Sequence, residues 1–327
     1  MIGGRLGTVI VTGGAGAIGS RLVRRLLDAG AERLIVIDDF SSGHAWLLPR
    51  DPRLTVVAAD VCELPALDLA VEAPLIFHLA AFFANQRSVE RPLEDLHTNG
   101  RGTLTVLSWA ADHGARRVVY ASAGCSIAGH ATAGPIGEDA PVSLHLDTPY
   151  QITKALGEFY CNYFDDRVST VRCRFFNSYG PGEVPGRYRN VVPNWIWRAL
   201  AGEPLVITGT GAETRDFVFV DDLVEGLLLA ATHEAAGGGV FNLGTGVETE
   251  ILTLAEAVIR ACGSASRVDF APRRPWDQSL RRCADISRAR SVLGFAPKTT
   301  LETGIARTVA WFVEHRERVE TALHAAT

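Results

Sequence analysis

The 327-residue sequence contains no uncharged apolar run of about 18 residues, the length that a membrane-spanning helix requires. Its first residues, Met1 to Arg5, lead directly into a strand-like run, which is not the pattern of a signal peptide. An excess of basic residues is absent too, because the formal net charge is −5, whereas nucleic-acid-binding surfaces are strongly basic. We therefore expect a cytoplasmic protein with no signal peptide, no membrane segment and no nucleic-acid partner.

Cysteine pairs of the C-x-x-C type are also missing. The six cysteines are scattered along the chain at positions 62, 125, 161, 173, 262 and 283. Such spacing is typical of buried thiols in a reducing cytosol, and it argues against a disulfide framework or a zinc site. We expect no bound metal.

Lysine is nearly absent. Only two of the 32 basic residues are lysines, and one of them, Lys154, follows Tyr150 by four positions. On a helix, residues four apart lie on one face, about 5–6 Å apart between their Cβ atoms. An ammonium group there favours the phenolate, so it lowers the pKa of a phenol whose ordinary value is roughly 10. The pair predicts a tyrosine that accepts a proton from a hydroxyl near neutral pH. Chance would give this spacing in roughly 4% of such chains, so by itself it is a hypothesis.

The first half of the chain alternates continuous β-branched runs with helical patterns. The strand-like runs lie at 8–12, 33–37, 54–58, 75–79 and 117–121, with helical segments at 20–29 and 102–113. Such strands, separated by helices, indicate a parallel sheet that is covered on both faces. We predict an α/β fold of the Rossmann type, a doubly wound parallel sheet, with a smaller mixed α/β substrate-binding lobe.

A glycine-rich turn follows the first strand-like run and leads into a helical pattern, Thr12 to Gly19. Gly13, Gly16 and Gly19 allow the tight turn, the close approach of a pyrophosphate and close helix–strand packing. The helix N-terminus offers free N–H groups to phosphate. Asp38, about 20 residues further on, would accept hydrogen bonds from the adenosine ribose and repel a 2′-phosphate. The motif predicts NAD rather than NADP.

The chain changes character at Gly180, where glycine and proline dominate the next seven residues. We predict that residues 1–176 and about 216–245 form the NAD-binding Rossmann domain. Residues about 177–215 and 246–327 would then form the lobe that binds the second ligand, with the ligand between the two lobes at the carboxyl ends of the strands.

Together these motifs resemble the extended short-chain dehydrogenase/reductase family, and within it the nucleotide-sugar 4-epimerases of the UDP-glucose 4-epimerase type. The likeness covers nearly the whole chain. Besides the glycine-rich turn and the Tyr150–Lys154 pair, it rests on segments 38–43, 60–61, 78–81, 99, 102–104, 174–177, 214–217, 220–222 and 273–277.

The motifs and the resemblance together imply three groups of site residues. The cofactor would be held by Gly13, Gly16, Ala17, Ile18, Gly19, Asp38, Asp39, Phe40, Ser41, Ser42, Gly43, Asp60, Val61, Leu79, Ala80, Ala81, Phe83, Asn99, Tyr150, Lys154 and Phe176. The sugar nucleotide would be held by Ser126, Tyr150, Asn177, Arg187, Arg189, Asn190, Val191, Arg215, Arg274 and Asp277. Catalysis would fall to Tyr150 and Lys154, together with Ser122 or Ser126.

The chain departs from the family pattern at one position. Members usually carry a serine or threonine five residues before a glycine that corresponds to Gly129, and here that position is Gly124. Ser122 or Ser126 could supply the hydroxyl, since both share the parity of Gly124 in an extended backbone, or Tyr150 could work without one. The same segment lacks the carboxylate that 4,6-dehydratases and UDP-glucuronate decarboxylases carry there.

We therefore predict an NAD-dependent UDP-sugar 4-epimerase that inverts C4 through a transient 4-keto sugar. Arginines 187, 189, 281 and 282 are either surface charges or partners of a C6 carboxylate. The sequence therefore favours neither of two substrate pairs over the other, UDP-glucose/galactose or UDP-glucuronate/galacturonate. The alternatives are a UDP-glucuronate decarboxylase, another sugar-nucleotide oxidoreductase and, more remotely, a non-catalytic NAD-sensing regulator. The resemblance also implies a homodimer through helices around 93–113 and 153–164.

Overall fold

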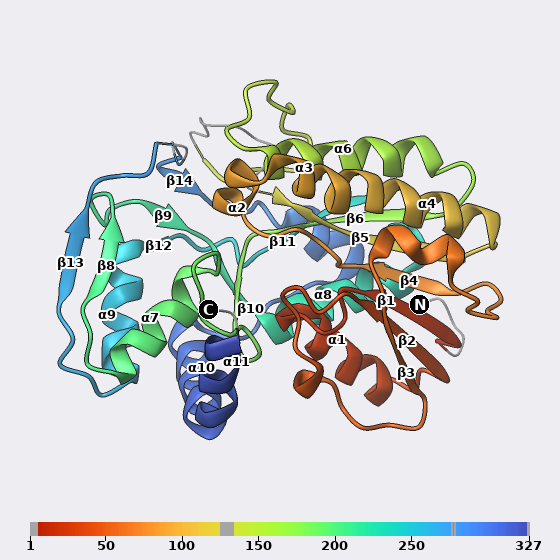
Figure 1. The fold of residues 1–327 in the computed structure, drawn as a ribbon. Helices are drawn as coiled ribbons and strands as arrows, with labels where there is room; N and C mark the ends of the chain where they lie inside the picture. The colour runs from red at the N-terminus through yellow and green to blue at the C-terminus, as the bar shows by residue number, and fades with distance from the viewer. Residues whose placement is uncertain (1–5, 125–133, 276, 278, 326–327) are drawn as a thin grey trace.

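A computed structural model describes residues 6–124, 134–275, 277 and 279–325. Its main feature is a seven-stranded sheet in the order β11-β6-β5-β4-β1-β2-β3, and every strand pairing in it is parallel (Figure 1). The strands are β1 (Thr8–Thr12), β2 (Arg33–Asp38), β3 (Leu54–Ala58), β4 (Leu75–His78), β5 (Arg117–Ala123), β6 (Thr170–Phe175) and β11 (Val240–Leu243). The predicted Rossmann-type fold is confirmed. The strand order reverses between β1 and β4, which places the binding crevice at the carboxyl ends of these strands.

The sheet is covered on both faces because its strands are apolar on both faces. In β1, Val9 and Val11 belong to one hydrophobic core and Ile10 to the other, since successive side chains of a strand point to opposite faces. The first core is closed by α1 (Ala17–Asp28) and α8 (Val220–Thr232), and the second by α4 (Gly102–Asp112) and α6 (Pro149–Phe164). Figure 1 shows these two helical layers above and below the sheet.

Shorter elements connect the strands and helices of this first lobe. They include two short helices, α2 (Asn85–Glu90) and α3 (Pro92–Asp95), which pack against α6. The helical turns are η1 (Ala45–Leu47), η2 (Val61–Ala66), η3 (Leu96–Arg101) and η4 (Glu234–Ala236).

The second lobe is built from short strand pairs and four helices of the described chain. The helices are α7 (Val191–Leu200), α9 (Ile251–Ala261), α10 (Leu301–Glu314) and α11 (Arg316–Ala325). The strands pair as β7 (Asn177–Tyr179) with β10 (Phe217–Phe219), β8 (Leu205–Thr208) with β13 (Val268–Ala271), and β9 (Thr214–Arg215) with both β12 (Thr249–Glu250) and β14 (Arg281–Arg282). A separate core holds them together, with Trp195, Ile207, Leu254 and Phe312 among its buried members.

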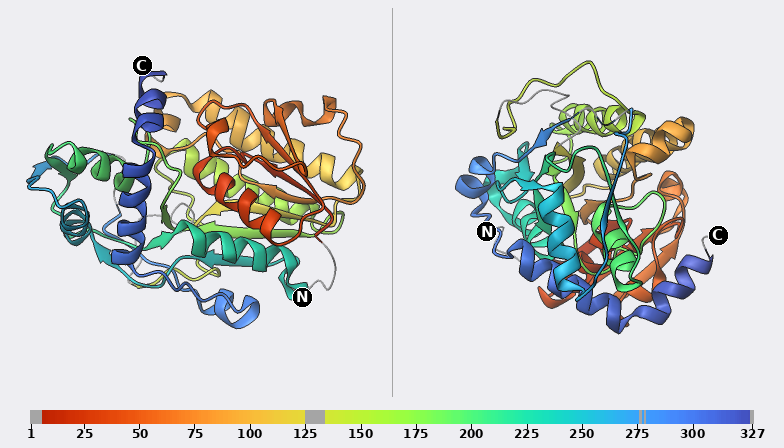
Figure 2. Two further views of the ribbon diagram at one scale, coloured as in Figure 1. Left: turned by 90° about the horizontal axis from the view of Figure 1, so that it is seen from below. Right: turned by 90° about the vertical axis from the view of Figure 1, so that its left-hand side faces the viewer.

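The C-terminal helices also reach the first lobe. In the left view of Figure 2, α10 and α11 lie between the second-lobe helices and the sheet. Trp311 of α10 stacks on Trp46 of η1 with ring centroids 5.8 Å apart. The helical turn η5 (Ala289–Leu293) and the residues after it pack into the first lobe. Ala289, Leu293 and Phe295 belong to the same hydrophobic core as α1 and α8. The two-lobe division drawn from the sequence stays a prediction, and this segment is an exception to it.

No helix in the described part of the chain is both long enough and apolar enough to cross a membrane.

Candidate active site

One cavity of about 850 Å³ follows the carboxyl ends of the sheet strands and extends into the second lobe. Most of the site residues expected from the sequence line it. They are Gly13, Gly16, Ala17, Ile18, Gly19, Asp38, Asp39, Ser41, Ser42, Gly43, Asp60, Val61, Leu79, Ala80, Ala81, Phe83, Ser122, Tyr150, Lys154, Phe176, Asn177, Arg187, Arg189, Asn190, Val191, Arg215, Arg274 and Asp277. Phe40 and Asn99 do not line it, and Ser126 lies outside the described residues. The individual binding roles stay predictions.

The glycine-rich turn is shaped by close backbone packing. A β-carbon on Gly13, whose φ is +71°, would stand 2.6 Å from the amide nitrogen of Ala80, and one on Gly19 would stand 2.7 Å from Cα of Gly14. A β-carbon on Gly16 would meet nothing closer than 3.4 Å, and this residue faces the cavity. Helix α1 begins after Gly16 with no side-chain cap, so its first N–H groups are available to an anion.

Asp38, the last residue of β2, contacts the glycine-rich turn. Its carboxylate accepts hydrogen bonds from the backbone N–H of Ala15 at 2.8 Å and of Phe40 at 2.9 Å. Each oxygen keeps a second lone pair for a ligand hydroxyl. Burial raises the pKa of Asp38 above its ordinary value.

Asn99 supports the cavity wall from behind. Its Oδ1 accepts a hydrogen bond from the Phe82 N–H at 2.8 Å, and its Nδ2 donates to Asp95 at 2.7 Å. Asn99 is 1% exposed, so it fixes the chain that carries Leu79 to Phe83 rather than facing the cavity.

A group with metal-ligand chemistry lies near the same wall. Among the described residues, Asp60, Cys62 and His97 bring their ligand atoms within 4.8 Å of one another. The Asp60 carboxylate is engaged, because it accepts from the Cys62 N–H at 2.7 Å and contacts His97 at 3.1 Å. Burial raises the pKa of the Cys62 thiol to about 11.

Tyr150 and Lys154 lie in the first turns of α6. The helix starts where the sequence allows it, because Thr148 caps the N–H of Gln151 and Pro149 occupies the first turn. Helix α2 fixes this end as well, since Ser88 Oγ accepts from the Tyr150 N–H at 3.1 Å and Asn85 Oδ1 accepts from the Thr148 hydroxyl at 2.8 Å.

The Lys154 ammonium lies beneath the tyrosine. Its Nζ stands 5.7 Å from the centroid of the Tyr150 ring and donates to the carbonyl oxygen of Ala121 at 2.8 Å. Burial lowers the pKa of Lys154 to about 8, while the charge of Asp95 acts in the opposite direction. The ammonium form of Lys154 therefore predominates beside the phenol below about pH 8 and is lost above it.

Of the two hydroxyls considered from the sequence, that of Ser126 lies outside the described residues, and that of Ser122 is already engaged in a hydrogen bond. Ser122 is buried and donates to Oε1 of Glu158 at 2.5 Å. Glu158 in turn accepts two hydrogen bonds from Arg174, at 2.9 and 2.8 Å. At Gly124, the ring of Phe176 occupies the space of a side chain, since an added β-carbon would lie 2.9 Å from Cζ and closer still to Cε2.

The second lobe contributes a cationic wall. Arg215 Nη2 donates to both carboxylate oxygens of Asp277 at 3.2 Å, and Arg282 stands 3.7 Å from the same carboxylate. At the start of this lobe, Oδ1 of Asn177 is buried and has no hydrogen-bond partner among the described residues. A buried, unpaired carbonyl oxygen that lines a cavity is suited to a ligand N–H or O–H.

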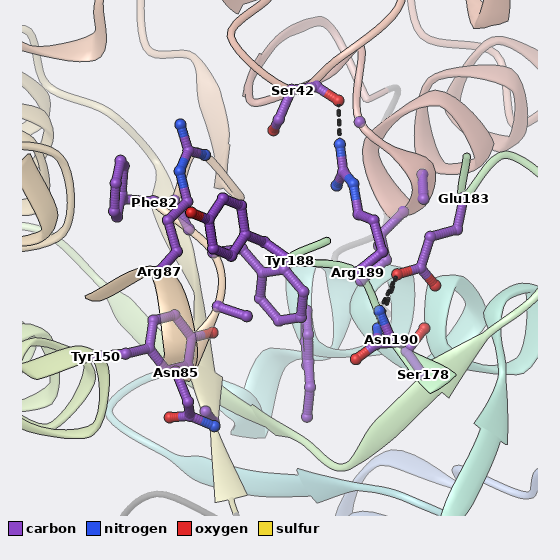
Figure 3. A pocket seen from close by; sticks show the side chains of 18 of the residues that line it. Ser42, Phe82, Asn85, Arg87, Tyr150, Ser178, Glu183, Tyr188, Arg189 and Asn190 are labelled. Atoms are coloured by element: carbon purple, nitrogen blue, oxygen red, sulfur yellow. Dashed lines mark hydrogen bonds between the residues drawn. The ribbon is translucent and has the colours of Figure 1, made fainter. Parts of the chain in front are cut away.

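The loop before α7 carries two of the four arginines that were weighed as carboxylate partners. Arg187 pairs with Glu90 at 2.9 Å, and Arg189 donates to the carbonyl oxygen of Ser42 at 2.6 Å (Figure 3). Arg281 pairs with Glu248 on the surface. Glu90 also accepts a hydrogen bond from the Tyr188 hydroxyl. Neither Glu90 nor Tyr188 was predicted from the sequence, because Glu90 lies about a hundred positions before its two partners and no local motif marks either residue.

Comparison with known proteins agrees with this geometry. The family model described as "NAD dependent epimerase/dehydratase family" matches residues 9–244. The chain belongs to this family. The predicted family resemblance and the predicted cofactor, NAD, are thereby confirmed.

Individual relatives match this chain along nearly its full length. A UDP-glucose 4-epimerase of Mycolicibacterium smegmatis is 39% identical, over 93% of this chain and 97% of the relative. An epimerase structure from Methanothermobacter thermautotrophicus aligns with a TM-score of 0.93 and 42% identity, covering 96% and 94% of the two chains. A Thermotoga maritima UDP-glucose 4-epimerase structure with UDP-glucose aligns with a TM-score of 0.89 and 31% identity, covering 94% and 99%.

The described residues fit NAD. The open space at Gly16, the uncapped start of α1 and the remaining lone pairs of Asp38 suit a pyrophosphate and a ribose. The unpaired Oδ1 of Asn177 lies further along the same cavity wall, beside Phe176.

Proposed function

We propose that this enzyme is an NAD-dependent UDP-sugar 4-epimerase, with UDP-glucose and UDP-galactose as its substrate pair. The observation that carries the proposal is the continuity of one cavity. The glycine-rich turn, the Tyr150–Lys154 pair and the Arg215–Asp277 wall all line it, so a cofactor and a sugar diphosphate can meet at the tyrosine. The two UDP-glucose 4-epimerase relatives described above support the same reaction.

The chemistry divides among the residues as follows. NAD, when bound, supplies the site that takes a hydride from C4 of the sugar and gives it back to the other face. Tyr150, as phenolate, accepts the proton of the C4 hydroxyl and later returns it. Lys154 stabilises the phenolate by its charge. Arg215 and Arg274 hold the diphosphate by charge-assisted hydrogen bonds while the 4-keto sugar turns over.

The contacts of the arginines favour the neutral sugar pair over the hexuronate pair. Arg187 and Arg281 each pair with a carboxylate within the protein. A C6 carboxylate would have to compete with Glu90 or Glu248 for these cations. A neutral hydroxymethyl group makes no such demand.

Decarboxylation is the second candidate, because a UDP-N-acetyl-α-D-glucosaminuronate decarboxylase of Bacillus cytotoxicus is 30% identical over 93% of this chain. We rank it lower because Glu158, the carboxylate nearest to Ser122, is already paired with Arg174 behind the cavity wall.

We also propose that the enzyme is a homodimer. Leu93 is 80% exposed, and Phe159 and Tyr163 of α6 are 55% and 69% exposed. These apolar side chains lie on α3 and α6, two helices that pack together along one edge of the molecule (Figure 1). A two-fold contact through this edge would cover them. We propose a cytoplasmic location as well, since the five described cysteines are free thiols.

The decisive experiment incubates the purified enzyme with UDP-glucose, and separately with UDP-glucuronate, without added cofactor. We expect NMR to detect UDP-galactose in the first sample and an unchanged sugar in the second. Release of carbon dioxide with a UDP-pentose product would assign the decarboxylase reaction instead.

A further inference from the structure

The loop between Gly186 and Asn190, which we call the strap, spans the cavity and is held firmly at both ends. Asn194 of α7 accepts a hydrogen bond from the Gly186 N–H at 3.0 Å and donates to the carbonyl oxygens of Gly186 and Asn190 at 3.1 and 3.0 Å. The buried Glu183 accepts from both the N–H and the side-chain amide of Asn190, at 3.2 and 2.9 Å.

The tip of the strap contacts two different walls of the cavity. On one wall, Glu90 of α2 accepts from Arg187 at 2.9 Å and from the Tyr188 hydroxyl at 2.6 Å. On the other wall, Arg189 donates to the carbonyl oxygen of Ser42 at 2.6 Å (Figure 3). Ser42 belongs to the segment that follows Asp38, the last residue of β2. The strap therefore connects the second lobe to both sides of the cofactor cleft.

The position of Arg189 places a cation beside the cofactor segment. Its side chain is half-buried and lines the cavity together with Gly16, Ala17 and Ser42. Burial and then the positive charge of Arg189 lower the pKa of His44, the residue that follows Gly43. An arginine that already uses one N–H for a carbonyl oxygen keeps four others for phosphate oxygens.

We propose that the strap retains bound NAD and that Arg189 is a cofactor-binding residue, which meets the pyrophosphate rather than the sugar. Retention suits a reaction that regenerates its cofactor in each turnover, and only this point rests on the proposed function. NAD can leave past the strap only if the contacts of the strap with Glu90, or its contact with Ser42, are broken. The hydrogen bonds to Glu90 therefore help to keep the strap closed over the cofactor.

The test measures how long NAD stays bound, without any turnover. Wild-type, Arg189→Gln and Glu90→Gln proteins are loaded with NAD and passed through gel filtration, and the NAD content and dissociation rate are followed by absorbance and by fluorescence. Loss of a charge-assisted hydrogen bond weakens binding by about tenfold or more. We therefore expect Arg189→Gln to release NAD at least about tenfold faster, and Glu90→Gln to release it severalfold faster.

Two controls separate this role from a general effect. Arg260→Gln removes an exposed arginine of α9 that pairs with Glu256, and it should leave the dissociation rate unchanged. Arg189→Gln also removes the hydrogen bond to Ser42, so each protein is compared with itself: adding NAD should raise the melting temperature of the wild type by more than that of Arg189→Gln. An unchanged NAD dissociation rate in Arg189→Gln, or an equal rise in melting temperature on adding NAD, would overturn the proposal. Since no sugar nucleotide is present, these results are independent of whether UDP-glucose is the substrate.

Discussion

The ring of Phe176 lies over Gly124, in the space that any side chain at position 124 would need. A β-carbon built on Gly124 would stand 2.9 Å from Cζ and 3.0 Å from Cδ2 of this ring, and closer still to Cε2. The two residues follow adjacent strands, β5 and β6, so their contact is fixed by the sheet register. A hydroxyl side chain at position 124 and an aromatic ring at position 176 therefore exclude one another in this arrangement.

Gly124→Ser should lower the free energy of unfolding by about 1–3 kcal/mol, because the added atoms overpack this contact. The double variant with Phe176→Leu should recover part of the loss. Urea unfolding followed by tryptophan fluorescence measures both. Gly137→Ser is the matched control, since a β-carbon there meets nothing within 4 Å. Equal stabilities of the two single variants would show that the ring moves aside without cost.

Tyr150→Phe should abolish most epimerase activity and keep NAD bound. Removing a group that transfers a proton in the reaction typically costs about 10²–10⁴-fold in rate. The conversion of UDP-glucose, followed by NMR, reports the loss, and the absorbance of the purified protein reports its NAD content. Normal turnover by this variant would show that Tyr150 is not the group that transfers the proton.

The alkaline limb of the activity profile should reflect Lys154. Burial lowers its pKa to about 8, so its ammonium is present below this pH and is lost as the pH rises through it. Without the charge, the Tyr150 phenolate is less favoured, and kcat/KM should fall above about pH 8. Lys154→Met should lower activity at pH 7 and flatten this limb. Lys298→Met, which changes the only other lysine, should leave the profile unaltered.

Acid should destabilise the fold through His78. Its ring lies between the hydroxyls of Thr12 and Thr103, at 2.7 and 3.0 Å, and burial lowers its pKa to about 3. In the unfolded chain the pKa is about 6.5. The unfolded state thus binds one more proton between these values, and stability is lost as the pH falls from 6.5 towards 3, by roughly 2 kcal/mol at pH 5.

The measurement is the urea-unfolding free energy between pH 7 and pH 5. His78→Asn should be less stable at pH 7 but should show a shallower dependence on pH. His145→Asn, which replaces an exposed histidine, should keep the slope of the wild type. A slope that His78→Asn leaves unchanged would assign the acid sensitivity to other groups.

The proposed dimer should separate when a charge is placed on its apolar edge. Phe159→Arg introduces a guanidinium where we expect the partner's helix, and burying an unpaired charge is costly. Sedimentation equilibrium should find twice the chain mass for the wild type and the single chain mass for this variant. Val313→Arg, at a 62% exposed position of α10, should remain a dimer. A monomeric wild type would exclude the contact.

Much of the site could be predicted from the sequence, because its main parts are local. The glycine-rich turn and Asp38 are separated only by a helix and a strand, and Tyr150 and Lys154 by one helical turn. These patterns led to the fold, the family and the cofactor, all of which are confirmed. The roles of individual site residues, the division into lobes, the homodimer and the cytoplasmic location stay predictions.

The sequence by itself determined where strands, helices and the phosphate-binding turn form, since hydrophobic period and glycine positions act over a few residues. Only the tertiary structure decided the partners of Arg187 and Arg189, because Glu90 and Ser42 lie about 100 and 150 positions earlier in the chain. The tertiary structure likewise decided that the Ser122 hydroxyl donates a hydrogen bond to Glu158 and that the Phe176 ring fills the space at Gly124. Such contacts depend on which strands the sheet places side by side, and no local pattern records that choice.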